Sequence, residues 1–348
     1  MPLMKRRRWL CGLALAGAFG GAMAAASFPA LDHPAMAVRA PERDVLLAAA
    51  LAGQRVVAVG ERGIVVLSDD GARTWRQAHA VPVAVTLTAV QFVDAQRGWA
   101  VGHGGIVLHS EDGGENWVRQ ADGRTLAQAV LAAQDTADAH RLVAEGPDKP
   151  LLDLRFVDAR HGYIVGAYNL AFETRDGGAT WSSLMSRIDN PRGVHLYSIA
   201  VRGDSVFIAG EQGAMFRSRD GGASFAALQT SYRGSWFSVM ALPGRGLVAA
   251  GLRGNAMYSP DDGETWTAIE GTPPVTLVHG TVLPDSRVLM VNQAGELFMA
   301  RSGSPIAPLR LRTSLPAPSA LLPLPEGALL VVGLTGAIRL PTLEPATR

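Results

Sequence analysis

The sequence predicts an all-β fold, a seven-bladed β-propeller of four-stranded antiparallel blades with one helical insertion between the second and third blades. Two repeated patterns support this prediction. One is an aspartate motif that occurs five times and ends in an aromatic residue. The other is a tight turn between two hydrophobic runs, which recurs at nearly constant spacing. A period near 40 residues with several short strands per unit is typical of propeller blades.

The number of copies of the tight turn predicts the number of blades. It has the form Gly-x-x-Gly in its clearest copies, with Asn169 in place of the second glycine in the third copy. The copies begin at Gly60, Gly102, Gly166, Gly210 and Gly251, with weaker copies at Asn292 and Gly333. Their starts lie 42, 64, 44, 41, 41 and 41 residues apart. We therefore expect seven units and one insertion in the longest interval.

The second unit shows four strands per blade. Residues 87–93 alternate between apolar and polar side chains, as a half-buried strand does. Shorter runs at 99–101, 106–109 and 117–119 follow, each after a turn rich in glycine or aspartate.

We interpret the aspartate motif as a support for the hairpin between the third and fourth strands. Its short polar side chains can accept hydrogen bonds from turn amides, and its small residues permit positive φ. Five copies around a ring cannot converge on one site, so we predict a structural role rather than calcium binding or catalysis. The motif residues are Ser68, Asp70 and Trp75; Ser110, Asp112 and Trp117; Thr174, Asp176 and Trp181; Ser218, Asp220 and Phe225; Ser259, Asp261 and Trp266.

The first 26 residues predict a signal peptide, with a basic start at residues 5–8, an apolar run at 9–21 and a cleavage site near Ala24 or Ala26. We therefore expect export to a periplasmic or lumen-like compartment. Cleavage or retention of the segment and the export route stay open. The only cysteine, Cys11, lies in this segment. Without it the net charge falls from +1 to −3, which gives no argument for a nucleic-acid partner.

The remaining chain divides into an N-terminal segment at 27–41 and the propeller at 42–348, with the insertion at about 120–150. The last unit ends soon after its third strand, so we expect residues 33–40 to supply its fourth strand. The insertion predicts one alanine-rich helix over 125–145 at the edge of the channel mouth. We expect its deletion to leave the fold intact.

Alternating strand direction places the Gly-x-x-Gly turns and the links between blades on one face, which we call the turn face. The aspartate motifs occupy the opposite face. Arginine and aromatic residues are favoured at protein contacts, although any one of them can equally belong to a solvated turn. No second histidine lies at a fixed spacing from His103, so we predict no metal site. The candidate partner-binding residues are Arg62, His103, Tyr168, Glu211, Gln212, Arg253, Arg192, Tyr232, Arg233 and Trp236.

The repeats resemble the BNR, or Asp-box, repeat. Their combination with the turn pattern resembles the photosystem II stability/assembly factor family, especially at residues 92–102 and 156–166. The resemblance covers residues 43–340 and implies a non-enzymatic scaffold that holds a membrane protein during assembly. It does not imply a photosystem, because bacterial relatives occur in organisms without photosynthesis. The family's arginine-rich patch is matched loosely by Arg62, Arg253 and Arg233.

We therefore expect an exported scaffold, monomeric and without cofactor, that binds a membrane protein or membrane protein complex through the turn face and the helical insertion. A transport system is one candidate partner. The alternative is an exported glycan-binding protein or glycoside hydrolase, because sialidases and some glucanases share the Asp-box. Hydrolysis needs two carboxylates about 5–10 Å apart. The candidates Glu61, Asp189 and Glu211 lie in separate units, and no spacing pairs them.

Overall fold

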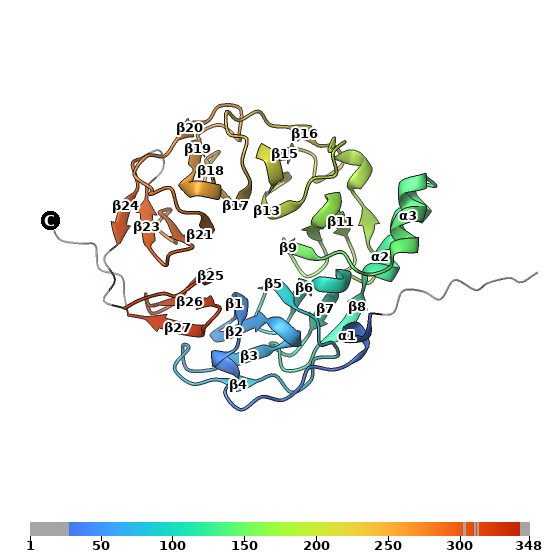
Figure 1. Cartoon of the computed structure of the whole chain (residues 1–348), viewed down its shortest axis with the longest axis horizontal. Helices are drawn as coiled ribbons and strands as arrows, with labels where there is room; N and C mark the ends of the chain where they lie inside the picture. Colours follow the sequence, from blue (N-terminus) through green and yellow to red (C-terminus); the bar gives the residue numbers. More distant parts are fainter. Residues whose placement is uncertain (1–27, 302–303, 310, 312, 342–348) are drawn as a thin grey trace, which may run out of the picture.

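The computed structural model describes residues 28–301, 304–309, 311 and 313–341. Seven antiparallel sheets stand around a central channel (Figure 1). In the described residues six sheets have four strands and one has three. The predicted seven-bladed propeller is thus confirmed. The predicted signal peptide at 1–26 lies outside the described residues.

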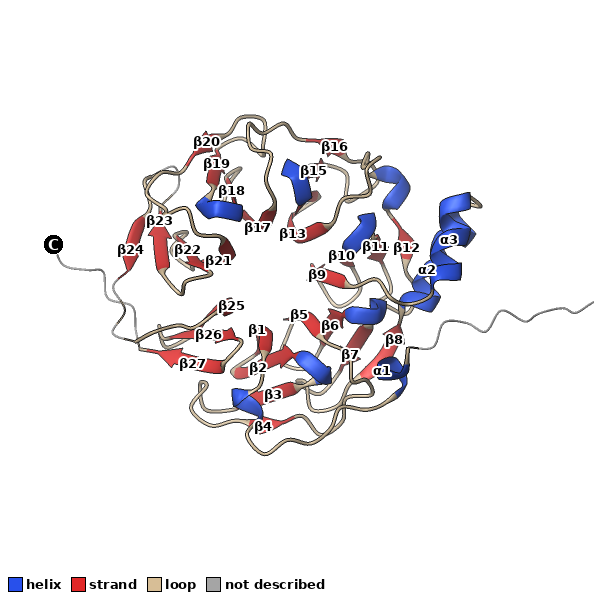
Figure 2. Cartoon of the chain, in the orientation of Figure 1, coloured by secondary structure: helices blue, strands red, loops and turns tan. Residues whose placement is uncertain are grey.

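The first four blades follow chain order from the channel outward, and Figure 2 shows their strands in red. They contain β1 (Leu46–Ala52), β2 (Arg55–Gly60), β3 (Val65–Ser68) and β4 (Arg76–Gln77); β5 (Leu87–Phe92), β6 (Gly98–Gly102), β7 (Val107–Ser110) and β8 (Val118–Ala121); β9 (Leu151–Phe156), β10 (Gly162–Gly166), β11 (Ala171–Thr174) and β12 (Ser182–Ser183); β13 (Leu196–Arg202), β14 (Ser205–Gly210), β15 (Met215–Ser218) and β16 (Ala226–Ala227).

The last three blades keep this order. They contain β17 (Trp236–Ala241), β18 (Leu247–Gly251), β19 (Ala256–Ser259) and β20 (Thr267–Ala268); β21 (Leu277–Val282), β22 (Val288–Asn292), β23 (Leu297–Ala300) and β24 (Ala307–Leu309); β25 (Pro318–Pro323), β26 (Leu329–Gly333) and β27 (Gly336–Leu340). The α-helices are α1 (Pro29–Asp32), α2 (Gly123–Ala133) and α3 (Ala137–Glu145).

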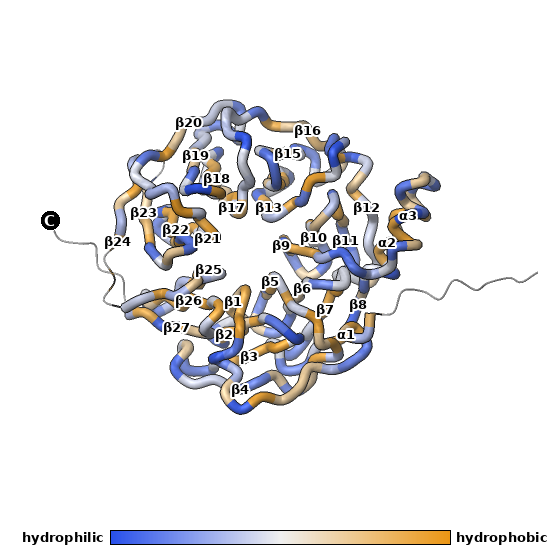
Figure 3. Tube along the Cα trace, viewed as in Figure 1, coloured by the Kyte–Doolittle hydropathy of each residue, from blue (hydrophilic) through white to orange (hydrophobic). Residues whose placement is uncertain are grey.

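The core lies between blades rather than in the channel. Seven clusters of buried apolar side chains each draw mainly on two neighbouring blades, including the pair formed by the first and the last. Figure 3 shows hydrophobic residues along the strands and many hydrophilic residues in the loops. The innermost strand β1 contacts both β5 and β25, so the ring is closed. Each blade therefore buries both faces of its sheet, which is the main stabilising term.

One close backbone approach recurs in every blade. The residue after the second strand donates its N–H to the carbonyl that precedes the first strand, as in Glu61 N to Val45 O at 3.1 Å and His103 N to Thr86 O at 2.8 Å. A Cβ atom added at Gly60 would overlap the Val45 carbonyl oxygen. At Gly60 the absence of a side chain is therefore what allows the close approach.

The sixth blade solves this problem with asparagine. The Oδ1 atom of buried Asn292 accepts hydrogen bonds from the backbone N–H groups of Ala294 and Glu296, at 3.0 and 2.9 Å. Asparagine is well suited to such turns because its side chain bonds the backbone locally. This explains why the turn persists there without its first glycine.

The insertion forms two helices, so the prediction of one helix over 125–145 is wrong. Asp122 caps α2, and the Thr136 hydroxyl accepts the Ala139 N–H at 3.2 Å to start α3. Helix α2 contacts the outermost strands β8 and β12, at the rim of the ring rather than at the channel mouth (Figure 1). Its residues Leu126 and Val130 belong to the core between the second and third blades. Deleting 125–145 would remove part of that core. We therefore expect the deletion to destabilise the fold, contrary to the prediction from the sequence.

The N-terminal segment does not supply the fourth strand of the last blade. Residues 33–40 form no strand and lie against the first blade, where Ala35 N donates to Val81 O at 3.0 Å. Helix α1 precedes them and inserts Leu31, which is fully buried, between the first and second blades. Asp32 pairs with Arg119 and Arg124, each at 3.3 Å. A buried leucine and satisfied backbone groups hold the segment there.

We predict that Leu31→Ala lowers the free energy of unfolding by about 2–5 kcal/mol, because it leaves a cavity between two blades. Met36→Ala is the matched control in the same segment, since its side chain is 73% exposed. Urea denaturation measures both. An equal, small effect of the two substitutions would show that the segment does not anchor the ring.

We further predict that Gly102→Ala costs about 2–3 kcal/mol of stability, since the new methyl group must displace the Thr86 carbonyl. Gly244→Ala is the control, because no atom lies within 4 Å of its added Cβ and only its positive φ opposes the change, at about 1 kcal/mol. Thermal and urea unfolding compare the two. A smaller loss for Gly102→Ala than for Gly244→Ala would contradict the steric argument.

Candidate functional site

The structure sorts the loops onto two faces. On one side the aspartate motifs bond to the turn between the first and second strands, as in Gly113 N to Gln96 O at 2.9 Å and Gly177 N to Arg160 O at 2.8 Å. On the turn face, the Gly-x-x-Gly turns bond to the links between blades in all seven blades. The two sets of loops thus lie at opposite ends of the strands.

The aspartate motifs satisfy their own polar groups. Asp176 accepts hydrogen bonds from the Thr174 hydroxyl at 2.8 Å, from Thr180 N at 2.9 Å and from the Thr180 hydroxyl at 2.6 Å. The hydroxyls of Ser224 and Ser218 lower the pKa of Asp220 to about 2. All five copies repeat this pattern. Each carboxylate accepts several hydrogen bonds from its own hairpin, which fits a structural role.

Five of the candidate residues are exposed at the tips of Gly-x-x-Gly turns. In four blades the third residue of the four-residue turn has a φ of 54° to 57°. These residues are Arg62, Tyr168, Gln212 and Arg253. This left-handed backbone is costly for residues other than glycine. His103 is the second residue of its turn, directly after Gly102. The structure therefore distributes these side chains around the ring rather than gathering them at one point.

The prediction that Trp236 is a partner-binding residue is wrong. It is the first residue of β17 and is fully buried between the fourth and fifth blades, where its ring lies 4.4 Å from that of Tyr232. The equivalent positions in the neighbouring blades hold buried leucines, Leu196 and Leu277. The first strand begins between two blades, so Trp236 cannot contact a partner. Tyr232 is half-buried and donates its hydroxyl to Leu252 O at 2.9 Å.

Three exposed arginines lie in succession on the turn face of the fourth and fifth blades. Arg192 donates to Gln212 at the tip of the neighbouring turn. Gly213 of that turn bonds Gly234 O, next to Arg233, and the Tyr232 hydroxyl bonds the carbonyl next to Arg253. We call Arg192, Arg233 and Arg253 the arginine row. None of them forms an ion pair within the described residues, whereas Arg62 pairs with Asp44 at 3.4 Å.

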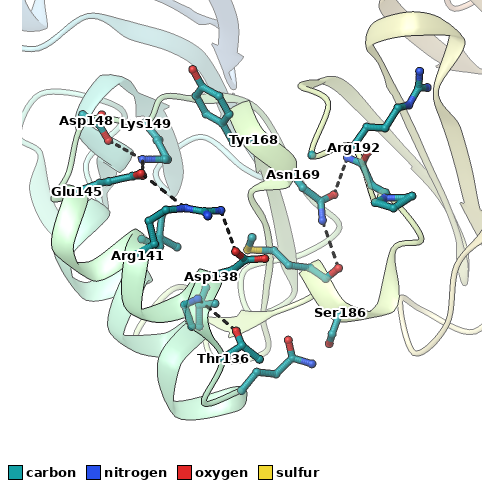
Figure 4. Close-up of a pocket in the computed structure, with 18 residues that line it drawn as sticks. Thr136, Asp138, Arg141, Glu145, Asp148, Lys149, Tyr168, Asn169, Ser186 and Arg192 are labelled. Carbon is teal, nitrogen blue, oxygen red and sulfur yellow. Dashed lines mark hydrogen bonds and ion pairs between the residues drawn. The ribbon is translucent and has the colours of Figure 1, made fainter.

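A groove of about 760 Å³ separates α3 from the third blade, and the sequence interpretation missed most of its lining (Figure 4). Lys149 sits 5.7 Å from the ring centre of Tyr168 and pairs with Asp148 at 2.9 Å. Arg141, on α3, is 65% exposed and pairs with Asp138 at 2.9 Å. The presence of an insertion was the only sequence signal for this groove.

The links and turns close the groove on the side of the arginine row. Asn190 donates to the side-chain oxygen of Asn169 at 3.0 Å and accepts Val194 N at 3.1 Å. Arg192 lines both this groove and a depression of about 150 Å³ that also contains Arg233 and Asp189. The groove and the arginine row are therefore continuous.

Of the three carboxylates considered for glycoside hydrolysis, Glu61 lies apart from Glu211, whereas Asp189 lies in the link that leads to the blade of Glu211. Glu61 lies in the first blade and Glu211 in the fourth, and at least two blades separate these two in either direction around the ring. Glu211 also accepts the His195 N–H at 3.2 Å. Within the described residues no group of three His, Cys, Asp or Glu side chains could hold a metal ion. No helix in this part of the chain is long and apolar enough to cross a membrane.

Comparison with known proteins identifies relatives over most of the chain. The model of the family described as photosynthesis system II assembly factor YCF48 matches residues 37–128 and 131–302. Photosystem II assembly lipoproteins Ycf48 from Synechococcus sp. (strain CC9902) and Parasynechococcus marenigrum (strain WH8102) are 33% and 39% identical over 120 residues. This aligned part is 34% of the chain and 36% of each relative, so the match spans about a third of their length.

Solved structures share the fold at low identity. YCF48 bound to a D1 peptide has a TM-score of 0.64 at 15% identity and covers 90% of this chain and 100% of that chain. YCF48 from Cyanidioschyzon merolae has a TM-score of 0.65 at 14% identity, covering 87% and 97%. A GH74 xyloglucanase from Xanthomonas campestris has a TM-score of 0.64 at 14% identity, covering 87% and 53%. The fold therefore does not separate scaffolds from hydrolases.

We predict that Asp220→Ala lowers the Tm at pH 7 by about 2–4 °C, because the hairpin loses its acceptor. The folded-state pKa of Asp220 is depressed, so its contribution is complete above the unfolded pKa near 3.9 and is lost as the pH falls toward 2. The difference from the unsubstituted protein should accordingly shrink between pH 5 and pH 3. Asp204→Ala is the control, an exposed carboxylate in the adjacent turn. A pH-independent difference would refute the assigned role.

Proposed function

The chain belongs to the YCF48 family of photosystem II assembly factors, and from this we propose that it is an exported, non-catalytic assembly factor that binds a membrane protein or membrane protein complex. The names of its relatives support this proposal, since the curated ones are photosystem II assembly lipoproteins and one solved relative is bound to a D1 peptide. Those names and the predicted signal peptide support a location on the exported side of a membrane.

The arginine row is the observation that best supports partner binding. Its three guanidinium groups are exposed and have no ion-pair partner in the described residues. Arginine forms bidentate hydrogen bonds with carboxylates and is frequent at contact sites. The three arginines outnumber the two nearby carboxylates, which are Asp189 in the depression and Glu211, whose side chain accepts the His195 N–H. We infer that the turn face takes an acidic segment of its partner.

The groove beside α3 extends this surface. Helix α2 belongs to the core, whereas Ala139 is the only buried residue that α3 contributes. Arg141 and Tyr168 present a cation and an aromatic ring at opposite walls of the groove (Figure 4). In this proposal α3 is the part of the insertion that meets the partner, while α2 anchors it.

The glycan alternative has less support. The xyloglucanase shares the propeller at 14% identity, and a likeness at this identity shows a common fold but not a common activity. Hydrolysis would need two carboxylates about 5–10 Å apart, and Glu61 and Glu211 lie in blades on different sides of the channel. A panel of glycosides and a glycan array with the mature protein test this alternative directly.

Reversing charge in the arginine row should abolish partner capture. We expect the double variant Arg233→Glu with Arg253→Glu to lose at least nine-tenths of the membrane protein that is crosslinked in intact cells and identified by mass spectrometry. The Tm should stay within about 2 °C, since exposed charges contribute little to stability. Arg160→Glu is the matched control, because Arg160 is exposed on the opposite face.

Two outcomes would contradict the proposal. One is an unchanged set of crosslinked membrane proteins in the double variant. The other is a glycan ligand, with no membrane protein recovered, from the unsubstituted chain.

A further inference from the structure

Every first strand carries a β-bulge at its start, on the turn face. The register shifts by one residue in all seven blades, for example between Leu46 and Ala48 and between Trp236 and Ser238. A bulge leaves one residue out of the regular pairing and redirects its side chain. The bulged residues are Leu47, Thr88, Leu152, Tyr197, Phe237, Val278 and Ser319, all half-buried and all lining a channel of about 520 Å³.

These side chains form an apolar patch in a channel whose wall also carries polar residues, among them Gln91, Arg155 and Thr281. Five of the seven are aliphatic or aromatic, and the rings of Tyr197 and Phe237 lie 5.1 Å apart. Thr88 bonds the carbonyl of Leu151 at 2.8 Å, so its hydroxyl is occupied. We call these seven residues the mouth ring. An apolar ring that is open to solvent favours an apolar ligand group.

Three polar side chains in the row beneath the mouth ring accept backbone hydrogen bonds. Asp153 accepts Ile199 N at 2.8 Å, and burial raises its pKa to about 6. Ser198 accepts Val239 N at 3.2 Å, and His279 accepts Leu321 N at 3.3 Å. These bonds join neighbouring innermost strands. The wall is therefore held in place before any ligand arrives.

Aromatic contacts connect the mouth ring to the groove at α3. Tyr168 at the groove lies 4.7 Å from His195, and His195 lies 6.1 Å from Tyr197 of the mouth ring, measured between ring centres. The links to the channel also carry two members of the arginine row: Arg192 precedes Tyr197 by five residues and Arg233 precedes Phe237 by four. Arg192 and Arg233 are therefore only a few residues along the chain from side chains of the mouth ring.

We propose that the mouth ring binds one apolar side chain of an extended acidic segment of the partner, whose carboxylates meet Arg192 and Arg233; this inference rests on the proposed function. Charge complementarity selects the acidic segment, and the half-buried ring selects the apolar residue. Four extended residues span at most about 13–14 Å. The carboxylate and the apolar residue should accordingly be within about four residues of each other.

The test uses two synthetic peptides of ten residues, identical except for leucine or glycine at the centre of a glutamate-rich sequence. Full burial of a leucine side chain is enough for a tenfold or larger difference in affinity. We expect the purified mature protein to bind the leucine peptide at least tenfold more tightly, by fluorescence anisotropy. Equal affinity for the two peptides would overturn the inference.

Substitutions assign the effect to its residues. Phe237→Ser with Tyr197→Ser should remove the preference for leucine and leave the affinity for the glycine peptide unchanged, whereas Arg233→Glu should weaken both peptides. A photoreactive benzoylphenylalanine at Ser319, a polar member of the mouth ring, covers the case in which the double variant unfolds. It should crosslink the leucine peptide, and the same probe at Asp204 on the opposite face should not.

The peptide assay tests the mouth ring and the cellular crosslinking tests the proposed function, so either proposal can be overturned without the other. Absence of a membrane protein in cells, with the leucine preference intact, would overturn the proposed function and leave the apolar site standing. Capture of a membrane protein that depends on Arg233 and Arg253, without any leucine preference, would support the proposed function and overturn the mouth ring.

Discussion

The structure depends on the contact between the end of each second strand and the start of each first strand. There a backbone N–H meets a carbonyl across a gap that leaves no room for a side chain at Gly60 or Gly102. Because the contact occurs in all seven blades, it fixes where each turn, each link and each bulge lies. The surface offered to other molecules is a consequence of this packed backbone.

The two faces of the ring differ in their chemistry. On one face, carboxylates such as Asp176 accept hydrogen bonds from their own hairpins and hold the turns in place. On the turn face, the tips hold exposed side chains on a left-handed backbone, and Arg253 has no ion-pair partner in the described residues. A rigid scaffold with adaptable tips suits recognition of a partner.

The insertion joins stability to recognition. Leu126 and Val130 fill the core between two blades, while the outer helix forms one wall of the groove. Arg141 and Lys149 in that groove are held by ion pairs with neighbouring acids, so their charges are locally balanced. The unbalanced charge lies farther along the face, in the arginine row. This distribution favours a partner segment that runs from the groove toward the channel.

The repeat period determined the blade number, the strand order and the placement of loops on two faces, because a closed ring of similar units has few solutions. The sequence alone also located four exposed arginines of the turn face, of which Arg62 and Arg253 lie at turn tips. It failed where long-range packing decides: Trp236 lies in the core because the first strand starts between blades, and residues 33–40 lie beside the first blade because Leu31 fills a space there. The mouth ring and the groove likewise exist only in three dimensions, since they unite residues from different blades whose distances no local pattern encodes.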